Sequence, residues 1–308
     1  MKRSLPAALA VPAVATLALF AGGCGTSTTA GAGSDGKVAV TAAFYTLQHA
    51  AEQVGGPHVT VTALTPPGAE PHDVELTPKA VAGLGSAQLV TYLKGFQPAV
   101  DQAVATVGRT AAYDVTADAR LTLTASDDGH NHAATAPDPH FWLDPTRYAA
   151  VVTALGERLA GIDPGHADDY RANAKRYAAQ LASVDADFTA GLAHCTSHEL
   201  VTGHAAFAYL ADRYGLHQES IAGLSPDTEP TPAQLASVTA FVKEHRVSTV
   251  YSETLVSPAL TETLARETGA KVAVLDPVEG ITSASAATDY VGVMRANLAT
   301  LRTGQQCQ

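Results

Sequence analysis

An unbroken helical pattern runs from about His166 to Leu192 and separates two series of short β-branched segments. It follows Asp163-Pro164 and contains neither proline nor glycine before Gly191. Its large apolar and aromatic residues are spaced three, four or seven positions apart, which places them on one helical face: Tyr170, Tyr177, Leu181, Val184 and Phe188. At about 1.5 Å per residue, roughly 26 residues form a rod of roughly 39 Å. The sequence therefore predicts a rigid helix, 164–192, between two other parts of the chain.

Both flanking parts alternate strand-like and helix-like segments, as an α/β fold does. Strands are predicted over 38–41, 59–64, 87–92 and 111–115, and again over 199–202, 217–221, 249–252 and 271–274. Helices are predicted near 44–54, 78–83, 97–107 and 290–301. The expected fold class is α/β: two similar α/β lobes, 37–163 and 193–308, joined by the long rigid helix. One large α/β domain with a long surface helix is the alternative.

The N-terminus has the features of an export signal. Lys2 and Arg3 precede an apolar run that ends in small residues, and Cys24 follows at once. This arrangement predicts a signal peptide at 1–23, lipid attachment to Cys24 and an extracytoplasmic protein anchored to the membrane. An uncleaved anchor is the alternative, but about 16 apolar residues fall short of the roughly 20 that span a bilayer. Residues 24–36, rich in Gly, Ser, Thr and Ala, predict a flexible tether.

Charge and cysteine content exclude several classes of protein. Acidic residues outnumber basic ones by 30 to 19, a formal charge of −11, so we expect no nucleic-acid partner. Three cysteines cannot form a four-thiolate zinc site.

Four side chains with metal-ligand chemistry follow predicted strands or close the first strand series: His72, His140, His204 and Asp276. In α/β folds the ends of the strands are where ligands bind. Three imidazoles and a carboxylate form a ligand set that zinc accepts in tetrahedral geometry. Taken singly, each residue is also typical of an ordinary loop or turn.

The sequence around these residues resembles a known family. His72 lies in Pro-His-Asp-Val-Glu-Leu-Thr-Pro, His140 in Asp-Pro-His-Phe-Trp-Leu-Asp-Pro, and His204 in Thr-Gly-His-Ala-Ala-Phe-Ala-Tyr-Leu, while Glu253 and Asp276 follow later strands. With these motifs, 37–307 resembles the metal-binding solute receptors of ABC importers, in the cluster that carries zinc and manganese. The resemblance implies a metal in the cleft between the lobes, held by His72, His140, His204 and Asp276. It places Glu253 near the cleft, where we expect it to support a ligand.

The resemblance implies a high-affinity extracytoplasmic zinc receptor that delivers zinc to the membrane permease of an ABC importer. Manganese receptors of this family generally carry a carboxylate where this chain has His204, so zinc is favoured over manganese, and copper binding stays open. A stretch with His130 and His132 resembles a shortened form of the His-rich loop of zinc receptors. A zinc-dependent hydrolase and a metal-binding surface adhesin are the alternatives. Because no hydrolase signature is present, we expect a receptor, not an enzyme, and we expect a monomer.

Cys195 and Cys307 remain after Cys24 is assigned to lipid. In an exported protein an even pair favours a disulfide, which here ties the C-terminal tail to the second lobe. Two free buried thiols are the alternative.

Overall fold

The computed structural model describes residues 36–124 and 137–308, which belong to one compact unit, Gly31–Gln308. The expected signal peptide, Cys24, nearly all of the tether, and His130 and His132 lie outside the described residues. Over the described ranges, no helix is both long enough and apolar enough to cross a membrane.

The first lobe is a parallel sheet with the strand order β2-β1-β3-β4. Its strands are β1 (Val38–Ala42), β2 (Val59–Ala63), β3 (Leu89–Tyr92) and β4 (Ala112–Asp114). Its helices are α1 (Tyr45–Gly55), α2 (Pro78–Leu84), α3 (Pro98–Ala103) and α4 (Thr116–Ala119), with a 3-10 turn at Gly56–His58 and a π-helical turn at Val104–Gly108. In register, Val40 lies between Val61 and Leu89. The central strand β1 is largely buried, as expected for a parallel sheet covered on both faces.

The second lobe repeats this topology, with the strand order β6-β5-β7-β8. Its strands are β5 (Glu199–Thr202), β6 (His217–Ser220), β7 (Thr249–Ser252) and β8 (Lys271–Val274). Its helices are α7 (Ala208–Tyr214), α8 (Pro232–Glu244), α9 (Ala259–Thr268) and α10 (Tyr290–Gly304). The prediction of two similar α/β lobes is therefore confirmed.

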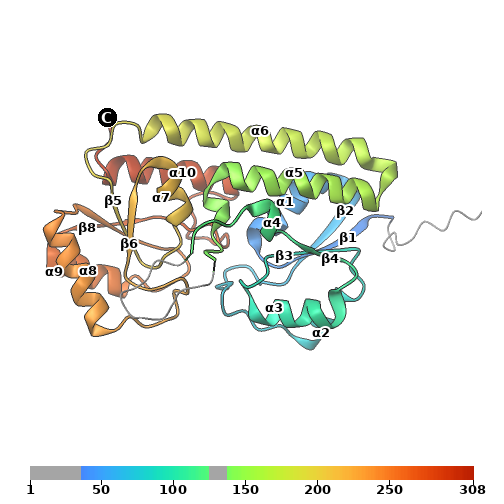
Figure 1. Cartoon of the computed structure of the whole chain (residues 1–308), viewed down its shortest axis with the longest axis horizontal. Helices are drawn as coiled ribbons and strands as arrows, with labels where there is room; N and C mark the ends of the chain where they lie inside the picture. The colour runs from blue at the N-terminus through green and yellow to red at the C-terminus, as the bar shows by residue number, and fades with distance from the viewer. Residues whose placement is uncertain (1–35, 125–136) are drawn as a thin grey trace, which may run out of the picture. The chain divides into compact units, whose positions relative to one another are not determined.

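Two long helices lie between the sheets in the sequence: α5 (Pro145–Ile162) and α6 (Ala167–Gly191). A 3-10 turn at Pro164–His166 separates them, because proline cannot continue a helix. Helix α6 packs against α5, against α1 of the first lobe and against α10 of the second (Figure 1). The five residues of its predicted apolar face are all buried. The predicted joining helix is thus confirmed, whereas α5 is an addition that the sequence analysis did not predict.

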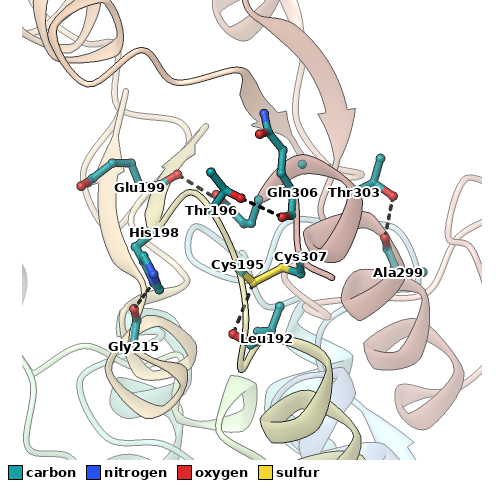
Figure 2. Close-up of a disulfide and its surroundings, with 12 residues drawn as sticks. Leu192, Cys195, Thr196, His198, Glu199, Gly215, Ala299, Thr303, Gln306 and Cys307 are labelled. Carbon is teal, nitrogen blue, oxygen red and sulfur yellow. Dashed lines mark hydrogen bonds between the residues drawn. A yellow bond between two sulfur atoms is a disulfide. The ribbon is translucent and has the colours of Figure 1, made fainter.

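A disulfide between Cys195 and Cys307 joins the segment after α6 to the end of the chain (Figure 2). The two cysteines face each other in an antiparallel bridge, and the Thr196 N–H donates to the Gln305 carbonyl at 3.1 Å. The expected pairing is confirmed. It ties the C-terminal tail, just after α10, to the start of the second lobe.

Candidate metal centre

Four side chains that follow different strands or turns meet in the interior: His72, His140, His204 and Glu279. One possible ligand atom from each lies within 4.8 Å of the ligand atoms of the other three. All four residues are buried. Two belong to the first lobe and two to the second, so the cluster joins the two halves of the fold.

His72 lies in the loop between β2 and α2, and hydrogen bonds from the Gln97 side chain hold this loop. The Gln97 amide donates to Thr65 Oγ1 at 3.0 Å and to the Pro71 carbonyl at 2.9 Å. The rings of Phe96 and His72 pack in a T-shaped contact, with centroids 4.7 Å apart. Burial lowers the pKa of His72 below its ordinary value, which favours the neutral imidazole that a metal requires.

His140 precedes a 3-10 turn, Phe141–Leu143, and is oriented by Asp138. Asp138 Oδ1 accepts from the His140 backbone N–H and lies 2.8 Å from Nδ1. Nδ1–H therefore donates to Asp138, and Nε2 points to the cluster. Burial would lower the pKa of His140, but the Asp138 carboxylate and Glu279 outweigh it and raise that pKa.

His204 follows β5 and is oriented in the same way by Glu253, which follows β7. Glu253 Oε1 accepts from the His204 backbone N–H at 2.9 Å, and Oε2 accepts from Nδ1. Nε2 is left facing the cluster, buried and without a hydrogen-bond partner among the described residues. Burial opposes charge on this ring, yet Glu253 and Glu279 raise the pKa of His204 well above its ordinary value.

Glu279 supplies the carboxylate of the cluster. Its Oε1 lies 3.2 Å from Nε2 of His72, 3.1 Å from Nε2 of His140 and 3.7 Å from Nε2 of His204. Burial alone would raise the pKa of this carboxyl, but hydrogen bonds from the imidazoles hold it well below its usual value. The carboxylate form is therefore favoured, and its Oε1 faces three imidazole nitrogens.

Glu279, and not Asp276, is the carboxylate that the structure brings to the three imidazoles. Asp276 follows β8 as expected, but its Oδ1 accepts from the Val278 N–H at 2.8 Å. Its backbone is bracketed by Asn297 of α10, which accepts from the Asp276 N–H at 3.0 Å and donates to the Asp276 carbonyl at 2.7 Å. Asp276 thus shapes the turn, and the turn presents Glu279.

Two residues of the cluster and its surroundings were not predicted from the sequence: Glu279 and Asp138. Asp138 stands two residues before His140 within a motif already singled out, and a carboxylate beside a candidate ligand histidine was the available signal. Glu279 follows the same strand as Asp276, so the strand-end argument applied to both. His204 itself lies outside any helix, in the segment between β5 and α7. Helix α7 begins at Ala208, because the Ala205 N–H is bound to the Gly223 carbonyl instead.

The fold and the site define a class: two matching parallel-sheet lobes, a joining helix, and a buried cluster of three imidazoles and one carboxylate shared by both lobes. A family model described as "ZnuA: Zinc-uptake complex component A periplasmic" matches residues 40–304. The chain belongs to this family.

Named relatives agree with that assignment. The chain is 34% identical over 302 residues to the high-affinity zinc uptake system protein ZnuA of Bacillus subtilis, covering 94% of this chain and 95% of that protein. It is 34% identical over 292 residues to zinc-binding protein AdcA of Streptococcus pyogenes serotype M6, covering 87% of this chain but 56% of AdcA. The chain thus spans about half the length of the AdcA relatives.

Solved structures give the same fold. A mutant of the laminin-binding adhesin Lmb of Streptococcus agalactiae matches with a TM-score of 0.77 at 30% identity, covering 87% of this chain and 99% of that one. Zn(II)-bound AdcA of Streptococcus pneumoniae matches with a TM-score of 0.74 at 33% identity, covering 89% of this chain and 59% of that one.

Proposed function

We propose that this chain is an extracytoplasmic zinc receptor that delivers zinc to the permease of an ABC importer. The observation that carries the proposal is the spacing of the four ligand atoms. Zinc bonds to nitrogen and oxygen are about 2.0–2.1 Å long, so the corners of a tetrahedron around zinc lie about 3.3 Å apart. Glu279 Oε1 lies 3.1–3.7 Å from the three Nε2 atoms, and Nε2 of His72 lies 3.2 Å from Nε2 of His140.

Hydrogen bonding alone explains this cluster poorly. A single carboxylate oxygen faces three ring nitrogens, and Nε2 of His204 is buried without a hydrogen-bond partner in the described part of the chain. An unpartnered buried polar group is destabilising unless something satisfies it. One divalent cation at the centre would take one lone pair from each of the four residues.

The donor set favours zinc over manganese. Imidazole nitrogens suit zinc and copper, whereas manganese prefers carboxylate, carbonyl and water oxygens. The names of ZnuA of Bacillus subtilis and AdcA of Streptococcus pyogenes support the same metal. Copper remains a competitor for the nitrogen ligands and belongs in any selectivity test.

Asp138 and Glu253 act in this proposal by fixing the ring orientation of their histidines. Each carboxylate holds an Nδ1–H, which leaves the Nε2 lone pair for the metal. Glu253 was expected to support a ligand, and we propose the same role for Asp138.

Transport, not catalysis, suits a closed ligand set. Catalytic zinc commonly has three protein ligands and an open water position, whereas four buried protein ligands would fill a tetrahedron. Membrane attachment through Cys24 completes the proposal, and the name of the zinc-binding lipoprotein AdcA of Streptococcus pneumoniae supports it. Labelling of expressed protein with a lipid precursor, lost in Cys24→Ala, tests the anchor.

Surface adhesion is a second candidate function. A structure described as Lmb of Streptococcus agalactiae, "a bifunctional protein with adhesin and metal transporting activity", matches with a TM-score of 0.76 at 29% identity. Saturable binding of this chain to immobilised laminin would support adhesion, and its absence would leave the zinc receptor alone.

Native mass spectrometry tests the zinc proposal. Protein purified without added metal should carry one zinc per chain. The variant His140→Ala should carry none under the same conditions, and an equal zinc content in both would overturn the proposal.

A further inference from the structure

Val278, the residue before Glu279, has an unusual backbone conformation. Its φ is 59°, in the left-handed region. Among the described residues, four non-glycine residues have a positive φ, and Val278 is the β-branched one; the others are Arg120, Arg246 and Gln306. A β-branched side chain in this region clashes with its own backbone, so such a residue persists only where surrounding contacts hold it. Val278 is fully buried, which fixes its side chain as well.

Contacts within the second lobe hold one end of this turn. Asp276 Oδ1 accepts from the Val278 N–H at 2.8 Å, and Asn297 of α10 brackets the Asp276 backbone. Asn297 is itself buried. These contacts fix where the turn starts, but they do not reach Pro277, the residue between Asp276 and Val278.

The contact to Pro277 comes from the first lobe. Trp142 Nε1–H donates to the Pro277 carbonyl at 2.8 Å. Trp142 is fully buried, and its own carbonyl accepts from the Tyr290 hydroxyl of α10. It stands two residues after His140, and the two rings have centroids 5.3 Å apart. One short segment of the first lobe therefore supplies both the cluster residue His140 and the hydrogen-bond donor to the turn that precedes Glu279.

We propose that Trp142 is a positioning residue that holds the 276–279 turn in its left-handed conformation and so keeps Glu279 on the three imidazoles. When the indole hydrogen bond breaks, Val278 returns to negative φ, the direction of the Glu279 side chain changes, and the metal loses its carboxylate. This inference rests on the proposed function, because it assumes that the cluster binds zinc.

The variant Trp142→Phe tests the inference, since it keeps an aromatic ring and removes the N–H donor. In the full chain, zinc affinity should fall about 10- to 100-fold, the range typical of residues that orient metal ligands, and zinc should dissociate faster. Affinity is measured by competition with a chelator, because Trp142 is the only tryptophan and its fluorescence is lost.

Tyr148→Phe is the matched control. It also removes a buried donor to a backbone carbonyl, the Tyr148 hydroxyl bound to the Thr46 carbonyl at 2.6 Å, but that carbonyl belongs to α1 and not to the turn. Its zinc affinity should stay within about twofold of wild type. Equal losses in Trp142→Phe and Tyr148→Phe would reduce Trp142 to a general core residue and overturn the inference.

Val278→Gly gives a second test, which separates the hydrogen bond of the indole from its packing. Glycine adopts positive φ freely, so the turn no longer needs the indole to hold it. Trp142→Phe should therefore cost much less affinity in the Val278→Gly background than in the wild type. An equal cost in both backgrounds contradicts the inference. If wild type binds zinc tightly and Trp142→Phe binds it equally well, only this inference fails; if wild type itself binds no zinc, the proposed function fails.

Discussion

The imidazoles of the cluster are oriented by contacts of different strength. His140 and His204 each donate Nδ1–H to a buried carboxylate, Asp138 and Glu253 respectively. His72 is held by its loop and by the T-shaped contact with the Phe96 ring. A carboxylate on Nδ1 fixes the tautomer and makes Nε2 a stronger ligand, so the two carboxylates should contribute directly to metal affinity.

Glu253→Gln should weaken zinc binding about 10- to 100-fold, because a neutral amide accepts the Nδ1 proton less strongly than a carboxylate. Glu262→Gln is the matched control, since Glu262 is an exposed glutamate of the same lobe. Chelator competition measures both. Unchanged affinity in Glu253→Gln would remove Glu253 from the site.

Glu279→Gln and Asp276→Asn separate the two carboxylates that follow β8. Glu279→Gln should weaken zinc by more than about 100-fold, because it removes the charge of a proposed ligand, a larger loss than an orienting residue gives. Asp276→Asn keeps an oxygen that accepts from the Val278 N–H, so its loss of zinc affinity should stay below about 100-fold. Isothermal titration with a competing chelator ranks them, and the reverse order would return the fourth ligand to Asp276.

Zinc affinity should fall as the pH falls. Against the effect of burial, neighbouring carboxylates raise the pKa of His140 and raise that of His204 well above its ordinary value, so these rings take up protons more readily than a free imidazole. Protons then compete with the metal, and their release on binding strengthens affinity as the pH rises. Competition titrations between about pH 6 and pH 8 measure the slope. A flat profile would contradict the imidazole ligand set.

At the scale of elements, periodicity predicted the parts of the fold that local sequence controls. The helix expected over 166–192 is observed as Ala167–Gly191, and β5, β7 and β8 have their predicted bounds. Helix α5 was missed because Gly156 and Gly161 interrupt its pattern. A Cβ on Gly156 would lie 2.8 Å from the Ala174 Cβ of α6, so this glycine serves the close approach of two helices.

The candidate site, like the fold, could be predicted only in part from the sequence. Three histidines could be predicted, because each stands in a motif near the end of a strand or strand series. Glu279 could not, because its direction depends on the left-handed Val278 turn and on the hydrogen bonds that this turn makes with Trp142 and Asn297, which are distant in sequence. Strand ends predict which loops meet, but not which of two acids in one loop faces the ligand.

The disulfide should stabilise the second lobe without shaping the site. Its cysteines are separated by 112 residues, and removing such a bond commonly lowers the free energy of unfolding by about 2–5 kcal/mol. The double variant Cys195→Ser/Cys307→Ser should show that loss in denaturant unfolding and keep wild-type zinc affinity. A large loss of affinity would mean that the tail positions the cluster.

In the folded unit as a whole, both lobes pack on helix α6, and both contribute residues to the buried cluster. Helix α6 contacts both α1 and α10, and one apolar core cluster runs from β1 to α10. Because two of the four cluster residues come from each lobe, a bound ion would join the lobes directly. Zinc should therefore stabilise the fold, by about 2.7 kcal/mol when free zinc is 100 times the dissociation constant.

The cluster of His72, His140, His204 and Glu279 should be a selective zinc site, and a competition titration of the metal-free chain with zinc and manganese tests this directly. Imidazole-rich coordination predicts one tight zinc per chain, manganese bound far more weakly, and loss of the tight step in His204→Ala. Comparable affinities for the two metals, or a tight zinc step that survives in His204→Ala, would contradict it.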